Sequence, residues 1–284
     1  MDLDSLNEEI KKLMDARNNK GIPEFEDYSP FEMHNIVQNL FDENCPIKIK
    51  KLKTADFHRI PIFNGVKFLL DQLSATEGIK LTAKGYLPTK IVSNLYNQKY
   101  FSEEMIDKGI SKLYKETDSL YVRLCRILLE LSGVAKKAKG QLILTKKGKN
   151  CLVKDQLLFE EILKAYCKKF NWGYFDGYEL ENIGRLGCGF SIYLLNKYGN
   201  EVLQNDFYAK KYFTAYPILI EEIHPRYGTV ESYVSRCYSY RMLEQFGMLT
   251  GIIKTIGEHK YGEPKFIQKT ELLELLFEVN QPNN

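Results

Sequence analysis

The feature that most constrains how this chain folds is an apolar helix that ends at a glycine and leads into a hairpin. The spacing of leucines predicts the helix over residues 118–131, with Gly133 as the residue that follows its last turn. Two strands are predicted next, over residues 134–139 and 141–145, joined by a Lys-Gly turn. Three helices followed by a hairpin are typical of a winged-helix domain, in which the hairpin is the wing.

The same order recurs near the end of the chain. Residues 128–135 align with residues 242–249 without a gap, which pairs Gly133 with Gly247. Beyond Gly247 the sequence predicts a strand over 249–256, a turn over 257–263, a returning strand over 264–269 and a final helix over 271–277. The recurrence predicts a tandem repeat in which each of the two glycines ends a buried helix and begins a hairpin.

We therefore expect an α+β fold that is predominantly α-helical, with two winged-helix-like units joined by a helical connector. Each unit is expected to have a three-helix core and a β-hairpin wing. The length of 284 residues agrees with about two domains. The expected segments are an N-terminal helical and acidic segment (1–56), a first winged-helix-like domain (57–170), and a connector with the second winged-helix-like domain (171–284).

Other helices are predicted from their capping residues and apolar periodicity. Ser29, Pro30 and Glu32 form a capping box with proline at the first helical position. Ser102 is expected to cap a helix that continues through Leu113. Further helices are expected over residues 6–18, 61–72, 88–96, 188–197, 206–216 and 217–223, and from Thr229 to about residue 240.

Composition and cysteine usage favour a cytoplasmic protein that does not enter a membrane. Apolar residues make up 44% of the chain, but their runs are far shorter than a membrane-spanning helix requires. The first residues are acidic, unlike a secretory signal. The six cysteines form no C-x-x-C pair, which predicts buried free thiols in a reducing compartment and no structural zinc site.

No motif in the sequence indicates an enzyme, a metal or a cofactor. The glycines of 184–189 do not have the order of a dinucleotide-binding loop, so a tight connection between helices is the better interpretation. Asp176, Glu179 and Glu181 could in principle hold Mg²⁺, but three carboxylates in a polar loop are usually solvated. Cys188 has no histidine near it in the sequence and is not expected to be a nucleophile.

The charge distribution favours a nucleic acid, specifically duplex DNA, as the partner. Residues 134–154 contain seven lysines and no acid, although the net charge of the chain is only +3. The helix before the second hairpin has serines and an arginine on one side, which suits a DNA backbone. The expected binding residues are Ser232, Ser235, Arg236, Ser239, Lys254 and Lys260 in the second copy, and Lys136, Lys137, Lys139, Lys146 and Lys147 in the first.

The first copy offers fewer donors on the equivalent helix. There we expect Ser119, Arg123, Arg126 and Glu130 to face outward. We therefore expect DNA to bind mainly through the second copy, with the hairpin lysines adding salt-dependent phosphate contacts.

A protein partner is the alternative to DNA. Lysine-rich hairpins are often solvated edges that prevent strand-to-strand aggregation. Degenerate winged helices also serve as protein-interaction and assembly modules, and the acidic segment 1–32, with nine acids and four bases, could contact a partner or a second copy of the chain.

The motif Leu-Thr-x-Lys-Gly occurs twice in the chain, at residues 81–85 and 144–148. The region that contains both motifs, about residues 57–165, resembles a broad group of uncharacterised bacterial and plasmid-borne proteins with a winged-helix-like domain. The group implies no established activity, so the resemblance supports the expected architecture and assigns no functional residue.

Overall fold

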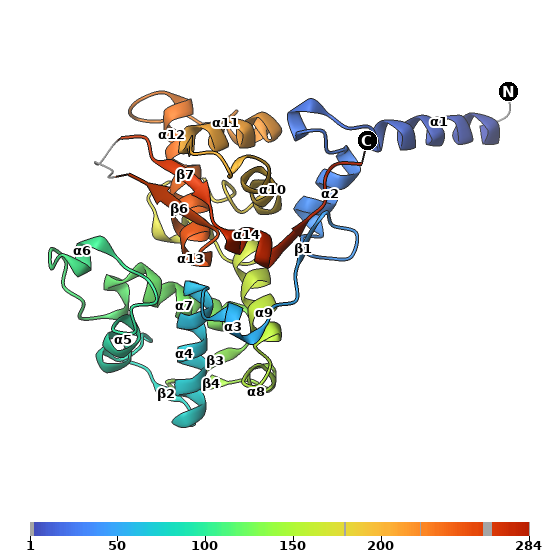
Figure 1. The fold of residues 1–284 in the computed structure, drawn as a ribbon. Helices are drawn as coiled ribbons and strands as arrows, with labels where there is room; N and C mark the ends of the chain where they lie inside the picture. The colour runs from blue at the N-terminus through green and yellow to red at the C-terminus, as the bar shows by residue number, and fades with distance from the viewer. Residues whose placement is uncertain (1–2, 179, 222, 258–262, 284) are drawn as a thin grey trace. The chain divides into compact units, whose positions relative to one another are not determined.

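A computed structural model describes residues 3–178, 180–221, 223–257 and 263–283, and it divides the chain into two compact units (Figure 1). Unit 1 contains Met1–Lys50, Asn182–Leu243 and Ile253–Asn284. Unit 2 contains Lys51–Glu181 and Glu244–Ile252. The two ends of the chain therefore share a unit, whereas the segments expected from the sequence follow one another along the chain.

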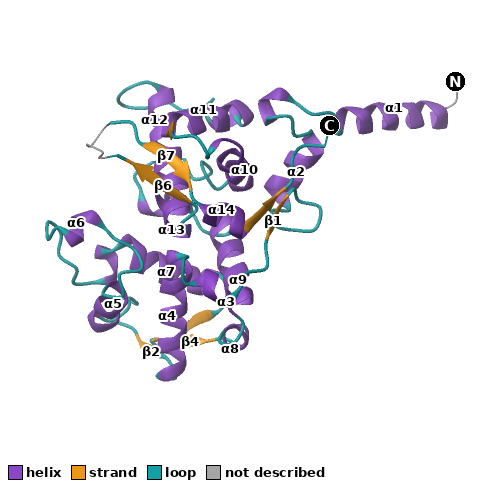
Figure 2. Cartoon of the chain, viewed as in Figure 1, coloured by secondary structure: helices purple, strands orange, loops and turns teal. Residues whose placement is uncertain are grey.

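Unit 2 has a helical core and one small antiparallel sheet (Figure 2). Its sheet has the strand order β2-β4-β3. The helices and strands are α3 (Thr54–Phe57), α4 (Pro61–Ala75), β2 (Ile79–Lys80), α5 (Thr89–Tyr96), α6 (Glu104–Asp107), α7 (Leu120–Leu131), β3 (Ala135–Ala138), β4 (Gln141–Leu144), α8 (Lys146–Cys151), α9 (Asp155–Lys168) and α13 (Met248–Thr250), with short 3-10 turns at Glu116–Asp118 and Trp172–Phe175.

Unit 1 also combines helices with short antiparallel strands. Its three-stranded sheet has the order β5-β7-β6, and β1 pairs with β8 in a second, two-stranded sheet. The elements are α1 (Leu3–Asn18), α2 (Pro30–Gln38), β1 (Ile47–Ile49), α10 (Cys188–Tyr198), β5 (Leu203–Gln204), α11 (Asn205–Ala215), α12 (Val230–Tyr238), β6 (Ile253–Ile256), β7 (Phe266–Lys269), α14 (Glu271–Leu276) and β8 (Phe277–Val279), with 3-10 turns at Pro23–Phe25 and Pro217–Leu219.

The two three-stranded sheets have the same topology and the same register. In each, a helix and a short strand are followed by further helices and then by a hairpin, and the last strand lies between the other two. Ile79 pairs with Leu142, which pairs with Lys137. In the other unit Leu203 pairs with Ile267, which pairs with Thr255. The repeat is therefore present as an arrangement of secondary structure.

The first glycine behaves as predicted, and the second does not. Gly133 has φ +74° and follows the end of α7. Gly247 has φ −64° and ψ −45°, which is right-handed helical backbone, so the helix continues through it to Thr250. Gly251, with φ +76°, ends that helix. The prediction for Gly247 is wrong, and the residue that corresponds to Gly133 lies four positions further along.

The extra length comes from a π-helix between α12 and α13, which we call η5 (Ser239–Gly247). A π-helix has hydrogen bonds from i to i+5 and a wider turn than an α-helix. Side chains after residue 238 therefore point in directions that a period of 3.6 residues does not predict. The boundary between the two units falls within η5, after Leu243.

Helices begin at several of the predicted capping residues, but the helix predicted after Ser102 is much shorter than expected. Ser29 and Glu32 form the predicted capping box at the start of α2. Thr145, Thr229 and Thr270 accept backbone hydrogen bonds at the starts of α8, α12 and α14. The helix expected after Ser102 is limited to α6, because Gly109 has φ +71° and ends it after one turn. Of the helix expected over 217–223, the described residues form a 3-10 turn at Pro217–Leu219.

Two glycines in the segment between the predicted repeats lie at close packing contacts. Gly187 has φ +70°, and an added Cβ would lie 2.5 Å from the ring of Tyr216. At Gly189 an added Cβ would lie 2.5 Å from the side chain of Leu40. Both glycines thus allow close packing in unit 1, which explains their occurrence without a phosphate-binding loop.

The fold class predicted from the sequence, α+β and predominantly helical, is confirmed. All six cysteines are buried free thiols, also as predicted. None of the helices in the described part of the chain has the length and apolarity needed to cross a lipid bilayer.

Candidate nucleic-acid interface

The hairpin of unit 2 presents lysines on a tight and well-defined turn. Strands β3 and β4 are joined by Lys139 and Gly140 alone, with φ values of +50° and +75°. Positive φ at both central positions defines a type I′ turn, whose twist matches that of the paired strands. Four backbone-paired positions, from Ala135 with Leu144 to Ala138 with Gln141, hold the two strands in register. The lysines are therefore carried by a rigid element.

We call residues 135–149 of unit 2, which comprise the hairpin and the start of α8, the basic hairpin. Lys136, Lys139, Lys146 and Lys149 are exposed, and none of them makes an ion pair with another described residue. Lys137 lies 3.9 Å from a carboxylate oxygen of Glu130. The basic hairpin thus keeps four lysines available to an anionic partner.

One predicted lysine of this set has a structural partner. Lys147 donates to the Ser132 carbonyl at 3.1 Å and to the Glu161 carboxylate at 2.8 Å. It connects the end of α7 to α9 within unit 2. It is therefore less available to a ligand than its neighbours.

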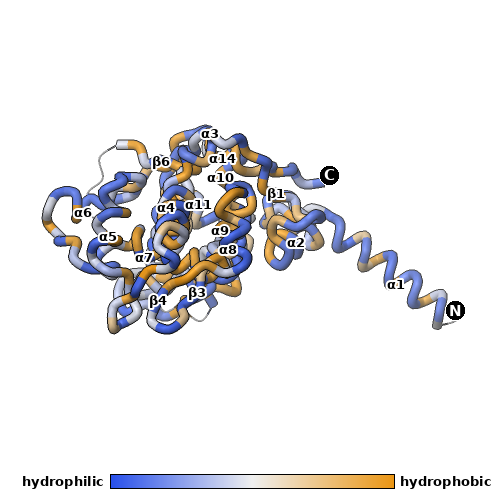
Figure 3. Tube along the Cα trace, turned by 90° about the horizontal axis from the view of Figure 1, so that it is seen from below, coloured by the Kyte–Doolittle hydropathy of each residue, from blue (hydrophilic) through white to orange (hydrophobic). Residues whose placement is uncertain are grey.

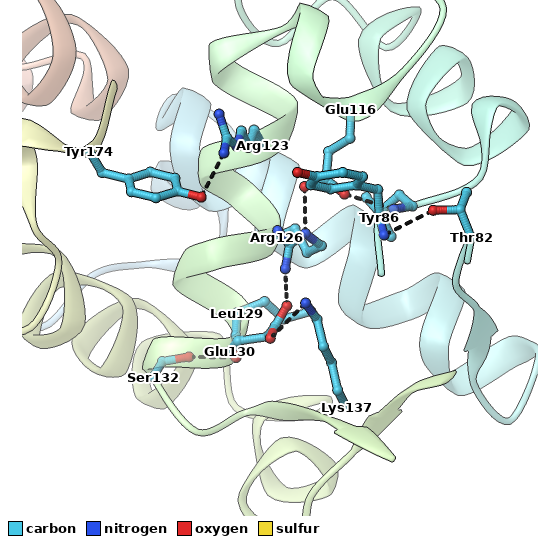
Figure 4. A network of polar contacts seen from close by, with 11 residues as sticks. Thr82, Tyr86, Glu116, Arg123, Arg126, Leu129, Glu130, Ser132, Lys137 and Tyr174 are labelled. Atoms are coloured by element: carbon cyan, nitrogen blue, oxygen red, sulfur yellow. Dashed lines mark hydrogen bonds and ion pairs between the residues drawn. The ribbon is translucent and has the colours of Figure 1, made fainter. Parts of the chain in front are cut away.

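A buried ion-pair network occupies the side of α7 on which the sequence predicted outward donors (Figure 4). The Arg126 Nε atom lies 2.6 Å from Glu116, which is fully buried, and the Arg126 guanidinium also binds Glu130. The Glu116 carboxylate accepts a further hydrogen bond from the backbone of Leu87 at 2.7 Å. Although burial alone would lower it, the pKa of Arg126 is raised by these two carboxylates.

The other donors expected on α7 are also engaged within unit 2. Ser119 is buried and donates to the Glu103 carboxylate. Arg123 donates to the Tyr174 hydroxyl at 2.6 Å and lies over the rings of Tyr174 and Phe175. The prediction that Ser119 and Arg126 face outward is therefore wrong, because both stabilise the fold.

In unit 1, helix α12 carries the serine and arginine face predicted to bind DNA. Thr229 caps the helix, and Ser232 and Arg236 are exposed. Ser235 is half-buried and donates to the Asp206 carboxylate at 2.5 Å. Ser239 is buried, at the start of the π-helix, and accepts a hydrogen bond from Asn205 at 3.0 Å. Ser239, predicted to lie on the binding face, is therefore not on the exposed surface of α12.

The face of α12 forms one wall of a hollow of about 730 Å³. The opposite wall is α11, and the side chains of Ala209, Phe213 and Val234 supply apolar surface. Charged side chains of both signs surround it: Asp206, Glu231 and Glu263 with Lys210 and Arg236. A hollow with more acids than bases is a poor surface for a phosphate backbone, which approaches along a convex or grooved basic surface.

Of the remaining two predicted residues, the structure places one on the hairpin of unit 1. Lys254 is exposed on β6, where it pairs through the backbone with Gln268. Lys260 lies outside the described residues. The structure therefore groups Lys136, Lys137, Lys139, Lys146 and Lys147 in unit 2, and Ser232, Ser235 and Arg236 in unit 1.

Sequence reasoning missed the α11–α12 hollow and the Glu116–Arg126 pair. Glu116 lies in a predicted loop, where a charged residue is ordinarily assigned to the surface. The only signal in the sequence is that Arg126 and Glu130 are four residues apart on one helix. No group of three metal-ligating side chains occurs within the described ranges.

Comparison with known proteins identifies a family to which part of the chain is similar. A family model described as the Y4jL N-terminal domain matches residues 58–157, which includes α4, the β2-β4-β3 sheet and the basic hairpin. The matched region is about a third of the chain and lies within unit 2. No curated protein and no solved structure matches the chain.

Proposed function

We propose that the chain is a non-enzymatic protein that binds duplex DNA through the basic hairpin of unit 2. The observation that carries the proposal is the set of exposed, unpaired lysines on a rigid type I′ hairpin, in a stretch of 21 residues (134–154) without an acid. Such a surface is attracted to a polyphosphate and releases counterions when it binds.

The proposal includes a winged-helix interpretation of both units. The order of a helix, a strand, further helices and a hairpin, with the last strand in the centre of the sheet, supports it in each unit. In a winged helix the hairpin contacts the DNA backbone beside the helix that enters the groove. The six buried thiols agree with the cytoplasm as the location of the protein.

The contacts favour backbone binding over base readout. The lysine ammonium is a point charge that suits phosphate, whereas arginine provides the bidentate contact to guanine. The arginines of α7 are engaged with Glu116, Glu130 and Tyr174. The unit 2 surface therefore offers phosphate contacts and few base-reading donors, and we propose binding with little sequence preference.

The test is the affinity of the full chain for a mixed-sequence duplex at low salt, measured by fluorescence anisotropy. The triple variant Lys136→Gln, Lys139→Gln and Lys146→Gln removes three contacts and should weaken binding at least about tenfold. The matched control replaces Lys108, Lys112 and Lys115, three exposed lysines of unit 2 outside the basic hairpin, with glutamine. Equal losses in both variants, or no binding by the unmodified chain, would exclude the proposal.

A protein partner is the second candidate, and the α11–α12 hollow is the observation that favours it. Its volume and apolar floor suit an inserted peptide or helix, with charged side chains at the rim. Substituting Ala209 with Trp would fill the hollow. A protein-binding function predicts loss of a captured partner in that variant with unchanged DNA affinity.

A further inference from the structure

Helix α1 carries an apolar stripe that nothing in the described structure covers. Leu6, Ile10, Leu13 and Met14 recur at intervals of three and four residues and so lie on one side of the helix. Figure 3 shows apolar segments spaced along α1 between hydrophilic ones. Their exposed fractions are 44%, 45%, 71% and 58%. Every described side chain from Asp4 to Lys20 is exposed, so no part of unit 1 packs against the stripe.

A helix of this length is not expected to be stable alone. With 16 residues, α1 is near the length at which an isolated helix is only marginally populated in water. Most helices of this kind are stabilised by packing of their apolar face. We therefore expect the stripe to pack against a partner surface.

The charges of α1 indicate what that surface is. Its first half contains Asp4, Glu8 and Glu9 and no base, whereas its second half contains Lys11, Lys12 and Arg17 with one acid, Asp15. Two copies side by side in antiparallel orientation place each acidic half against a basic half. Parallel copies would place like charges together. We propose that α1 pairs in antiparallel orientation with α1 of a second copy of this chain.

The base of α1 is fixed to unit 1, so that such pairing joins two whole molecules. Ile22 donates to the Tyr28 carbonyl at 3.1 Å, and an added Cβ at Gly21 would lie 2.4 Å from the Asp27 carbonyl oxygen. Glu26, in the same turn, contacts Lys211 of α11 at 2.6 Å. The helix thus leaves a firmly held turn, and the resulting dimer would be symmetric about the middle of the paired helices. This inference does not depend on the proposed DNA binding.

The first test is sedimentation of the full chain over a range of concentrations. Leu13→Glu should raise the dimer dissociation constant about a hundredfold, because each substitution occurs twice in the pair. The control is Ser5→Glu, which adds the same charge to the acidic half at a position outside the apolar stripe, and which should leave the dimer at least as strong. A chain that is monomeric throughout, or a Leu13→Glu chain that dimerises like the unmodified one, contradicts the proposal.

A second test separates antiparallel pairing from docking of α1 elsewhere on a second copy. Glu8→Lys with Glu9→Lys makes α1 largely basic, and Lys11→Glu with Lys12→Glu makes it largely acidic. Each double variant alone should dimerise more weakly than the unmodified chain, and the two mixed should form a heterodimer. If Leu13→Glu disrupts the dimer but mixing produces no heterodimer, the stripe binds another surface and antiparallel pairing is wrong.

Discussion

Arg126 stabilises the fold, although its position on α7 suggested that it would contact a ligand. It lies at a helical position that faces away from the leucine stripe of α7, yet it is only 6% exposed. Its partner Glu116 is fully buried, and a buried carboxylate is stable only where its hydrogen bonds are satisfied. Arg126 and the backbone of Leu87 satisfy them.

Arg126→Ala is expected to destabilise the protein by about 3–5 kcal/mol, because Glu116 would remain buried without its ion partner. Chemical denaturation of the variant measures this loss. Adding Glu116→Gln removes the unpaired charge and retains an acceptor for the Leu87 amide, so the double variant should be more stable than Arg126→Ala alone. Simple additivity of the two substitutions would show that the two residues are not coupled.

Lys139 is strained where asparagine or glycine would be relaxed. A φ of +50° is unfavourable for a lysine, and the first central position of a type I′ turn favours asparagine. Lys139→Asn should therefore raise the free energy of unfolding by up to about 1 kcal/mol. It should also weaken DNA binding, since it removes one of the exposed charges. A stabilised variant with unchanged affinity would exclude Lys139 as a phosphate contact.

At the scale of elements, the sequence was informative where local signals determine structure. The leucine stripe of α7, the Lys139–Gly140 turn and the caps at Ser29 and Thr270 act over a few residues, and each gave the predicted element. Strand β8 was not predicted, because its pairing with β1 joins residues more than two hundred positions apart. Pairing at that distance leaves no local pattern.

The candidate site was predictable in part for the same reason. The lysines of the hairpin follow from a local lysine-rich stretch without acids and are exposed as expected, although Lys147 also forms an ion pair with Glu161. On α12 the side of the helix predicted for each side chain is correct as far as Arg236. It is wrong at Ser239, where the π-helix begins. The hollow beside it depends on how α11 packs against α12, which periodicity within one helix does not specify.

Alanine substitutions at Gly133 and Gly251 are expected to lower the free energy of unfolding by similar amounts, because the two glycines occupy the same place in the two repeats. Both have positive φ, +74° and +76°. Replacing either with alanine should lower stability by about 1–2 kcal/mol through backbone strain. At Gly133 an added Cβ would meet nothing closer than the Lys147 ammonium at 3.9 Å. The loss of stability in Gly133→Ala therefore measures backbone strain without a steric clash. An unchanged melting temperature of the Gly133→Ala variant would contradict the left-handed backbone conformation of Gly133 after α7.

On the scale of the whole molecule, unit 1 is assembled from both ends of the chain. Strand β1 pairs with β8, and Tyr28 donates to the Asn280 carbonyl. Glu26 connects the first segment to α10 and α11 through Lys197 and Lys211, at 2.9 and 2.6 Å. Although burial raises the pKa of the Glu26 carboxyl, hydrogen bonds from Lys211, Tyr198 and Lys197 outweigh burial and hold the pKa below its usual value.

This carboxylate predicts a pH dependence of stability. Because the pKa of Glu26 is lower in the folded state, its contribution is complete above the ordinary value of 4.5 and is lost as the pH falls through the folded value. Glu26→Gln should cost about 1–3 kcal/mol at neutral pH and progressively less in acid. Denaturation as a function of pH measures both. The neighbouring exposed Glu24→Gln is the control and should have little effect.

The most direct test of DNA binding at the basic hairpin is lysine acetylation of the unmodified chain, followed by mass spectrometry, with and without a mixed-sequence duplex. Bound DNA should protect Lys136, Lys139, Lys146 and Lys149, and should leave Lys108 and Lys112 as reactive as in the free protein. Equal acetylation of the hairpin lysines in the presence and absence of DNA, under conditions in which the duplex is bound, would contradict the account.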